Sequence, residues 1–357
     1  MESIVYQVLP TLSYGDAVGN DTLAIARLLR VNGYENEIYA ENIHGRNTLQ
    51  CHPFAAIGNR IRPFDTVIYH LSTGTNMTYW FKQLKCRKIL IYHNITPPEF
   101  FGPYSSAAQS LTAFGRQTLR DLAGSVDKCI ADSQYNADEL IELGYTDVNV
   151  VPIYIPFSDY RQASDPEVCS LMQDGKTNIL FVGRLAPNKR QEDVIAAFYE
   201  YKKTYNANSR LILAGSGGGM ELYQAQLEKF ADALGIREDV IFTGHIPFNH
   251  ILAYYHTAHA FLCMSEHEGF CVPLVEAMFF KVPVFARNFG AIPETLGHAG
   301  VRFDDRNFPG IASAMNYVLT HDEAKAKVLF EQSLQLRKYE NDTVENELIS
   351  CLSEFLK

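Results

Sequence analysis

The sequence lacks the features that mark several classes of protein. No stretch approaches the roughly 18 continuous apolar residues of a membrane-spanning helix. The opening residues have no basic segment before an apolar run, so we expect no signal peptide. Seven scattered cysteines without a C-x-x-C pair favour neither a disulfide framework nor a zinc module. No basic half or stripe is present, because 41 Asp and Glu outnumber 31 Lys and Arg, and this disfavours binding to a nucleic-acid backbone.

The composition that is present is typical of a globular enzyme. The chain has 357 residues, of which 47% are hydrophobic and 20% charged, and its net charge is −10. Such a chain has enough apolar residues for complete cores and divides into about two domains of ordinary size. We therefore expect a two-domain enzyme in a reducing, cytoplasmic compartment.

Short strand-like runs alternate with helical patterns along the whole chain. The runs lie at 3–9, 65–70, 88–93, 128–132 and 148–151, and again at 178–182, 210–214, 240–243, 260–264, 283–286 and 301–303. Pro10 is expected to end the first run, and Asn20 to cap a helix that extends to Arg30. This alternation predicts an α/β protein with parallel sheets covered on both faces by helices.

The pattern weakens between the two series of runs, where Pro152, Pro156, Pro166 and Gly175 follow one another without periodicity. The sequence is therefore divided, as a prediction, into four parts. These are an N-terminal domain over 1–157, a linker over 158–176, a C-terminal domain over 177–335 and a final helix over 336–357 that crosses back to the first domain.

Glycine and polar residues gather directly after the predicted strands. They are Gly15, Thr73-Gly74, His93-Asn94, Gly183-Arg184, Gly215-Ser216, Gly244-His245 and Glu266–Gly269. In open α/β sheets the ligand crevice lies beyond the carboxyl ends of the strands. We therefore expect these residues to surround one cleft.

The segment from Ser265 to Met278 is the sharpest local signal. Pro273 suits the first position of a helix, whose free amides would form an anion site, and Gly269 lets the backbone approach a ligand. Glu276, one turn into that helix, and Glu268 on the preceding loop would flank this site. The arrangement suits a phosphorylated polyol. The alternative for Glu276 is a residue that only favours the helix dipole.

Two further loops were weighed for phosphate chemistry. Arg184 and Lys189 share the loop after a predicted strand and suit a diphosphate leaving group, although this loop taken alone is more typical of solvated surface charges. The glycines from Gly215 onward suggest a dinucleotide loop, but the G-x-G-x-x-G template requires glycine where Met220 stands. A dehydrogenase is therefore weakly supported.

These segments together resemble glycosyltransferase family four. The resemblance is carried by Gly183-Arg184 with Lys189, by Ala214-Gly215-Ser216-Gly217, and above all by Glu268-Gly269-Phe270, Pro273-Leu274 and Glu276-Ala277-Met278. It is strong over 178–305, moderate over 1–157 and thin at the C-terminus. It implies retaining, nucleotide-sugar-dependent chemistry on the GT-B fold, with two Rossmann-like domains whose parallel sheets face each other across a cleft. Cys271 departs from the glycine that many members have.

The resemblance also implies roles for single residues. His93, Glu268, Arg184 and Lys189 would form the catalytic set, with His93 touching the donor sugar from the opposite domain and Glu268 binding its reacting face. Glu276 would bind the ribose hydroxyls. The remaining donor-binding residues would be Gly15, Gly183, Gly215, His245, Ile246, Gly269, Phe270, Cys271, Val272 and Leu274.

The expected activity is transfer of a hexosyl group from a nucleotide-diphospho-sugar to a saccharide or lipid-linked saccharide in surface-polysaccharide biosynthesis. No cofactor and no metal are expected, and the histidines at 250, 256 and 259 are not interpreted as a metal site. A basic aromatic patch at 80–88 would allow peripheral contact with the inner face of a membrane, or would be a solvated helix end. The alternatives are a GT-B epimerase or hydrolase, for which Glu266 and Glu268 could pair, and a non-catalytic scaffold.

Overall fold

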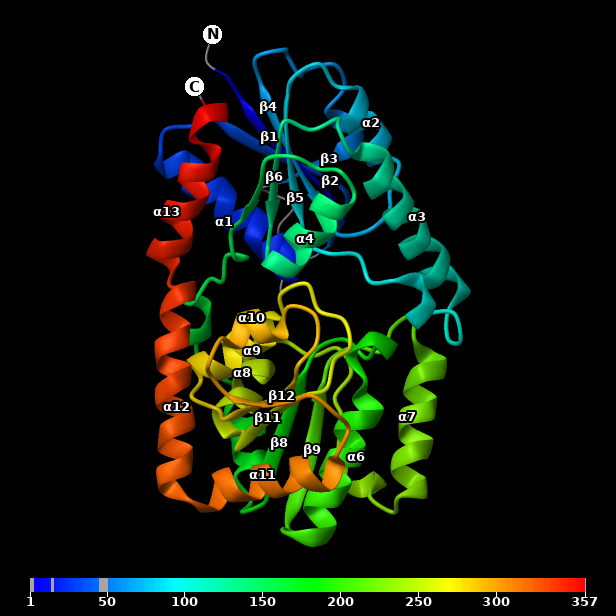
Figure 1. Ribbon diagram of the computed structural model, residues 1–357, viewed down its shortest axis with the longest axis vertical. Coiled ribbons are helices and arrows are strands. Elements are labelled where there is room, and N and C mark those ends of the chain that lie inside the picture. The colour runs from blue at the N-terminus through cyan, green and yellow to red at the C-terminus, as the bar shows by residue number, and fades with distance from the viewer. Residues whose placement is uncertain (1–2, 14–15, 45–50, 357) are drawn as a thin grey trace. The chain divides into compact units, whose positions relative to one another are not determined.

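The computed structural model describes residues 3–13, 16–44 and 51–356, which fold into two compact units that are described separately. Unit 1 comprises Met1–Pro98, Ser110–Phe157 and Tyr339–Lys357, and unit 2 comprises Glu99–Gln109 and Ser158–Lys338. Each unit contains its own sheet of parallel strands (Figure 1). Neither unit is a single continuous stretch of the chain, because short segments are exchanged between its two halves.

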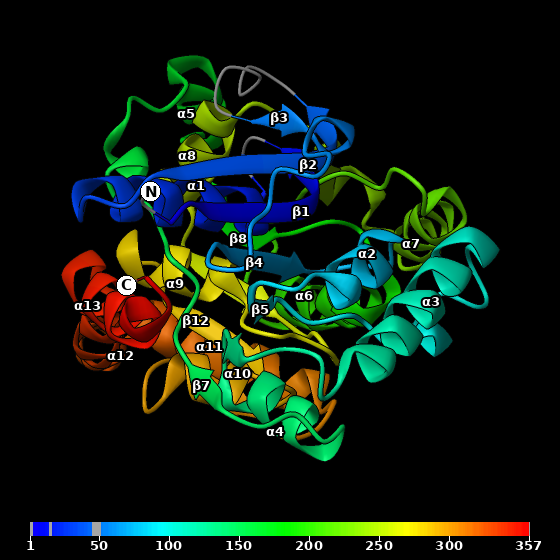
Figure 2. The same cartoon turned by 90° about the horizontal axis from the view of Figure 1, so that it is seen from above.

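Unit 1 is built on a seven-stranded sheet in the order β3-β2-β1-β4-β5-β6-β7 within the described residues (Figure 2). The strands are β1 (Val5–Ser13), β2 (Asn36–His44), β3 (His52–Pro53), β4 (Thr66–Leu71), β5 (Arg87–Tyr92), β6 (Lys128–Ala131) and β7 (Val148–Val150). The helices are α1 (Ala17–Val31), α2 (Met77–Gln83), α3 (Ser106–Leu122), which begins in unit 2, α4 (Gln134–Glu142) and α13 (Asn341–Leu352). Every residue of β4 is buried, as parallel strands covered on both faces require.

The first strand runs further than the sequence predicts. Strand β1 continues through Pro10 to Ser13, and Leu9 and Thr11 on either side of the proline still pair with β2. Pairing of β1 with β4 ends at Val8, so the missing N–H of Pro10 removes no bond on that edge. The following helix α1 also begins earlier than expected, because the side chain of Asp16 caps it by accepting from the amide of Gly19 at 3.3 Å.

Unit 2 contains a six-stranded sheet in the order β10-β9-β8-β11-β12-β13 within the described residues. The strands are β8 (Thr177–Val182), β9 (Ser209–Ala214), β10 (Val240–Phe242), β11 (Ala260–Cys263), β12 (Val284–Arg287) and β13 (Val301–Phe303). The helices are α5 (Pro166–Met172), α6 (Gln191–Thr204), α7 (Glu221–Ala233), α8 (Phe248–Thr257), α9 (Val272–Phe279), α10 (Ile292–Leu296), α11 (Phe308–Thr320) and α12 (Asp322–Leu336). All these strands lie within one or two residues of the positions that the sequence predicts.

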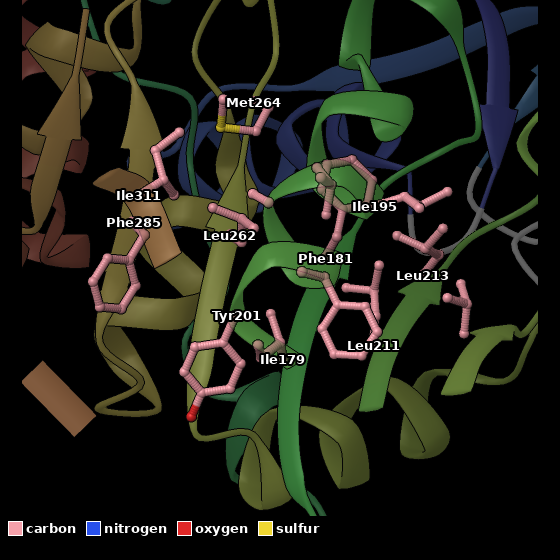
Figure 3. Packing of buried hydrophobic residues seen from close by; sticks show 14 of the residues in the cluster. Ile179, Phe181, Ile195, Tyr201, Leu211, Leu213, Leu262, Met264, Phe285 and Ile311 are labelled. Carbon is pink, nitrogen blue, oxygen red and sulfur yellow. The ribbon is translucent and has the colours of Figure 1, made fainter. Parts of the chain in front are cut away.

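The core of unit 2 packs against this sheet. Figure 3 shows Phe181 from β8 near Leu211 and Leu213 from β9, with Ile195 from α6 close by. Each of these side chains is at least 98% buried. Complete burial of such a side chain contributes about 1.5–3 kcal/mol to the free energy of unfolding. The sheet is therefore held rigidly, and the loops at its ends are positioned by it.

Residues 158–176, which the sequence pattern interprets as a linker, fold onto unit 2 instead. The side chain of Asp165 caps α5 by accepting from the amides of Glu167 and Val168, and Pro166 occupies the first turn. The amide of Asp165 donates to the carbonyl of Asn249, in the first turn of α8, at 3.0 Å. Pro166, one of the residues that suggested a linker, therefore begins a packed helix.

The C-terminal residues divide between the units. Helix α12 ends at Leu336 and α13 begins at Asn341, so the expected final helix over 336–357 is a separate element after a short 3₁₀ turn. Leu348 and Leu352 of α13 join the buried cluster of unit 1, and Asn341 donates to the carbonyl of Ile155 at 2.7 Å. No helix of the described residues is long and apolar enough to cross a membrane.

Candidate functional site

The point where the strand order of unit 2 reverses is the place to look for a ligand site. Strand β8 lies between β9 and β11, and the connections after β8 and β11 lead to opposite sides of the sheet order. In sheets of this kind ligands bind beyond the carboxyl ends of the strands at such a point. The loops that follow β8 and β11 carry Arg184, Lys189 and Glu268, which the sequence singles out.

An ion pair joins these two loops. The Lys189 ammonium lies 2.6 and 2.7 Å from the two carboxylate oxygens of Glu268, and 25% of the lysine side chain and 7% of the glutamate side chain are exposed. Burial lowers the pKa of Lys189, but the charge of Glu268 outweighs it, and the net effect raises this pKa. Lys189 is therefore charged at neutral pH, and its ammonium is fixed in position by Glu268.

Backbone contacts hold the same loops together. The side-chain amide of Asn188 donates to the carbonyl of His267 at 3.1 Å, and the amide of Glu266 donates to the carbonyl of Asn188 at 2.8 Å. The amide of Ala291 donates to the carbonyl of Glu268 at 3.0 Å. A Cβ atom on Gly290 would lie 2.7 Å from that carbonyl oxygen, so only glycine permits this approach. Glu268 is thus positioned by three separate loops.

The loop after β8 carries a second cation, Arg184, whose side chain is exposed to solvent. Its guanidinium lies 3.5 Å from the carbonyl of Gly218. The half-buried Gly183 and Gly215 bring the loops after β8 and β9 close together, because a Cβ atom on Gly215 would lie 2.0 Å from the carbonyl oxygen of Gly183. An exposed arginine beside a closely packed glycine loop is an arrangement that can accept phosphate oxygens.

Cys271 is the last residue of the loop that connects β11 to α9. It has φ of 73°, in the left-handed region where glycine is favoured, and it stands as the residue before the helix. The helix begins at Val272, one residue earlier than Pro273. The thiols of Cys271 and of Cys263, at the end of β11, interact, and this interaction lowers the pKa of Cys263 and raises that of Cys271.

Glu276 lies one turn into α9 and has two partners that the sequence analysis did not identify. The hydroxyl of Tyr160 donates to one carboxylate oxygen at 2.9 Å, and that of Tyr255 donates to the other at 2.7 Å. Burial raises the pKa of Glu276, and the tyrosine hydrogen bonds oppose this rise. Each oxygen keeps a further lone pair that can accept from a ligand hydroxyl.

The remaining predicted donor-binding residues line the same end of the sheet of unit 2. Their exposure falls into two groups: Phe270 and Leu274 are buried, whereas Gly269, Val272 and Ile246 are half-buried and His245 is exposed. Gly15 lies outside the described residues.

Glu266, which the sequence analysis weighed as a hydrolase partner of Glu268, belongs to a different cluster. One of its oxygens accepts from Arg287 at 2.6 Å and from Arg306, and the other lies 3.4 Å from Arg190. Since Glu268 pairs with Lys189 and Glu266 with three arginines, the two carboxylates are neutralised separately. Because each carboxylate has its own cationic partners, the arrangement does not favour a pair of carboxylates acting together as in a hydrolase.

His93 in unit 1 has both ring nitrogens engaged. Nδ1 lies 3.0 Å from Oδ2 of Asp132, and Nε2 lies 3.1 Å from Nδ1 of His70, whose Nε2 is 3.0 Å from Oε1 of Gln7. Only 1% of the His93 side chain is exposed, and Asp21 lies 4.0 Å from both histidines. The ring of His93 could contact a sugar only by exchanging one of these bonds.

This polar cluster of unit 1, formed by Gln7, Asp21, His70, His93 and Asp132, is electrostatically coupled. Burial holds the pKa of His70 well below its usual range. Burial also lowers the pKa of His93, but the charge of Asp132 reverses the effect and raises it. Burial raises the pKa of Asp21 to about 7. The sequence pattern does not single out His70 and Gln7, because both residues lie inside apolar strands.

Within the described residues, two groups of side chains have the donor atoms of a metal site: Asp21 with His70 and His93, and Cys263 with Glu268 and Cys271. The histidines at 256 and 259 belong to neither group.

The chain is similar to known glycosyltransferases. Residues 170–333 match the family model described as glycosyl transferases group 1. The O-antigen chain mannosyltransferase B of Escherichia coli is 25% identical over 272 residues, which cover 73% of this chain and 68% of that protein. The glycogen synthase of Mycobacterium tuberculosis is 28% identical over 198 residues, which cover 54% of this chain and only 45% of that protein.

Solved structures match the whole fold. Anabaena Alr3699/HepE, solved in complex with UDP and glucose, superposes with a TM-score of 0.76 and 17% sequence identity over 99% of this chain and 100% of that chain. This likeness identifies the fold as GT-B, in agreement with the sequence prediction of two Rossmann-like sheets. Residues 170–333 are thus similar to the glycosyl transferases group 1, within a chain whose fold is GT-B.

Proposed function

We propose that the protein is a retaining glycosyltransferase of the cytoplasm that moves a hexosyl group from a nucleotide-diphospho-sugar to a saccharide or lipid-linked saccharide acceptor in surface-polysaccharide biosynthesis. The observation that carries this proposal is the Lys189–Glu268 ion pair beside the exposed Arg184, at the strand ends where the sheet order of unit 2 reverses. Two cations on one loop match the charge of a diphosphate better than that of a neutral glycoside.

The donor site is assigned to unit 2. Arg184 and Lys189 bind the diphosphate, and the backbone around Cys271 and Val272 at the start of α9 adds amides and the positive end of the helix dipole. Glu276 accepts hydrogen bonds from the ribose hydroxyls with the lone pairs that Tyr160 and Tyr255 leave free. Glu268, held by Lys189, binds the hexosyl group. Acceptor recognition is assigned to unit 1.

The chemistry asked of these residues is stabilisation of the departing phosphate. As the bond from sugar to phosphate breaks, negative charge grows on the diphosphate, and fixed cations in a partly desolvated site lower the energy of that state. In the retaining mechanism implied by the family resemblance, the departing phosphate oxygen accepts the proton of the acceptor hydroxyl. The site therefore needs no separate protein base and no metal ion.

The relatives suggest the substrates. Alr3699/HepE is described in complex with UDP and glucose, and an O-antigen chain mannosyltransferase covers 73% of this chain. The first supports a nucleotide-linked hexose as donor, and the second supports a growing polysaccharide as acceptor.

Ligand-induced thermal stabilisation is the first test. Wild type and Glu276→Ala are melted with a panel of nucleotide diphosphates and nucleotide-hexoses, and Glu221→Ala on the exposed start of α7 is the matched control. A ligand at 100 times its dissociation constant adds about 2.7 kcal/mol to the free energy of unfolding. We expect one nucleotide series to stabilise wild type and the control but not Glu276→Ala. Stabilisation by none of them would contradict the proposal.

A further inference from the structure

The thiols of Cys263 and Cys271 have no task in the transfer chemistry, yet they lie beside its central carboxylate. The Sγ atoms of both cysteines and a carboxylate oxygen of Glu268 all lie within 4.8 Å of one another, and all three residues are buried. Cys263 ends β11, Cys271 precedes α9, and Glu268 is on the loop between them. Within the described residues, no other group of this kind contains a cysteine.

We propose that Cys263, Cys271 and Glu268 form a binding site for a soft divalent cation such as Zn²⁺, and that the bound cation opposes binding of the donor diphosphate. The second half of this statement rests on the proposed function, whereas the first half does not. Two thiolates and one carboxylate are a donor set that zinc accepts, with a fourth position left for water.

The spacing of the donor atoms is compatible with tetrahedral coordination. Zinc–sulfur bonds of about 2.3 Å at a tetrahedral angle place two sulfur atoms about 3.7 Å apart, and a sulfur and an oxygen somewhat closer. The observed limit of 4.8 Å therefore requires side-chain shifts of about 1 Å or less. The sulfur atoms already lie close together, and the metal would replace the protons of both thiols.

The charges of the site also balance. Without metal, Lys189 and Glu268 neutralise each other, and the balance is taken with both thiols protonated. Binding of Zn²⁺ releases one proton from each thiol to solvent, so two thiolates, one carboxylate, the cation and the Lys189 ammonium again sum to zero. A carboxylate has enough lone pairs to accept from Lys189 and to ligate the metal at once. No uncompensated charge is buried in either state.

A bound metal would weaken binding of the donor diphosphate, because the two ligands use the same residues. A metal ligated by Glu268 and by the residue that begins α9 holds the carboxylate and the helix start in positions set by the metal. The carboxylate assigned to the hexosyl group and the amides assigned to the phosphates would then be unavailable in their ligand-binding geometry. By linkage, the diphosphate must weaken metal binding by the same factor by which the metal weakens diphosphate binding.

The test uses Cd²⁺, which has the same preference for thiolates and absorbs in the ultraviolet when it binds them. The reduced full-length protein is titrated with CdCl₂, and then with ZnCl₂ in competition, and the absorption gives affinity and stoichiometry. We expect one strong site per chain in wild type. Cys263→Ala and Cys271→Gly should each weaken it by about 100-fold or more, since loss of even an outer-shell group costs 10–100-fold.

The two cysteine variants are independent tests of the metal site, and a third cysteine provides the control. Glycine suits the backbone of Cys271 at φ 73°, and Cys263→Ala is an independent variant, so failure of one to fold leaves the other. Cys169→Ser, on α5 of the same unit, is the matched control and should bind Cd²⁺ as wild type does. No thiolate absorption in wild type, or cadmium binding in the folded variants as strong as in wild type, would overturn the site.

Competition separates this proposal from the proposed function. The titration is repeated with the nucleotide diphosphate that stabilises the protein, and we expect the apparent cadmium affinity to fall. Cadmium binding that nucleotide leaves unchanged would overturn the opposition between the two ligands. Cadmium binding in a protein that no nucleotide stabilises would support the metal site and contradict the glycosyltransferase assignment.

Discussion

The two units place charged groups at the ends of similar parallel sheets, but they leave them in different states. In unit 2, Lys189 keeps a quarter of its side chain exposed and Arg184 is open to solvent. In unit 1, the side chains of His70 and His93 are 0% and 1% exposed, and their ring nitrogens bond within the polar cluster of unit 1. Charged groups that bind a ligand must retain access to it, whereas those that organise a fold need only each other.

We therefore expect substitutions in the two units to affect different properties of the protein. Changes in unit 2 should mainly alter ligand binding and transfer, and changes in the polar cluster of unit 1 should mainly alter stability.

Lys189→Ala should have the largest effect on transfer. It removes a cation from the leaving phosphate and leaves the carboxylate of Glu268 without its 2.6 Å partner. Loss of one such group lowers the rate by about 10²–10³-fold. The rate is measured with the nucleotide-hexose identified by thermal stabilisation, and Lys229→Ala on the exposed face of α7 is the control. A wild-type rate in the folded Lys189 variant would remove Lys189 from the site.

His70→Leu should have the next largest effect, on stability rather than on nucleotide binding. The change leaves Gln7 and Nε2 of His93 without their partner in a buried environment. The expected loss is about 2–3 kcal/mol of the free energy of unfolding, measured by denaturant titration. His70→Gln, which restores a polar group, should recover part of it. A variant that keeps its stability but loses nucleotide binding would break the contrast between the units.

Tyr255→Phe should weaken nucleotide binding about fivefold to tenfold, because one hydrogen bond to Glu276 contributes about 1 kcal/mol. The adjacent Tyr254→Phe is the matched control, since it lies on the same helix and outside the hydrogen bonds to Glu276. Isothermal titration with the nucleotide gives both affinities. Equal affinities would mean that Tyr255 does not position the carboxylate.

The last prediction concerns pH and sharpens the account of unit 1. The pKa of Asp21 rises from 3.8 to about 7 on folding, so between these values the native state holds a proton that the unfolded state has lost. Stability should therefore fall as pH rises from about 4 to 7, by at most about 1.4 kcal/mol per pH unit. The pKa of His93 is also raised, so His93 likewise lowers the stability as pH rises above 6.5. The other groups that act on this pair are Asp132 and His70, and the amide of Tyr154 donates to Asp21. Asp21→Asn should flatten the slope, and an unchanged slope would show that other groups cause it.

The sequence was most informative where local chemistry has a fixed spacing. Strand ends, the start of α9 and the positions of Lys189, Glu268 and Glu276 follow from neighbouring residues, and the structure brings all three to the same end of one sheet. Periodicity and turn chemistry are local, so a single sequence contains enough information to place such residues.

Partners that come from distant segments could not be found in this way. Tyr160 is 116 residues before Glu276, in a stretch whose prolines suggested a linker, and a tyrosine has no spacing that marks it as a carboxylate partner. His70 lies between two buried residues of β4 and is indistinguishable from a core residue by pattern. Pro10 was taken as a strand end because the sequence does not reveal that one edge of β1 is unpaired beyond Val8.

The exchange of short segments between the halves of the chain has a consequence for biosynthesis. Helix α13 covers Ile25, Leu29 and Ile89 of unit 1, yet the ribosome makes it only after the whole of unit 2. Until then, an apolar face of unit 1 has no cover and is open to aggregation. Unit 1 thus matures after unit 2 although most of it is translated first, and a nascent chain arrested after Lys338 should bind chaperones that a chain arrested beyond α13 releases.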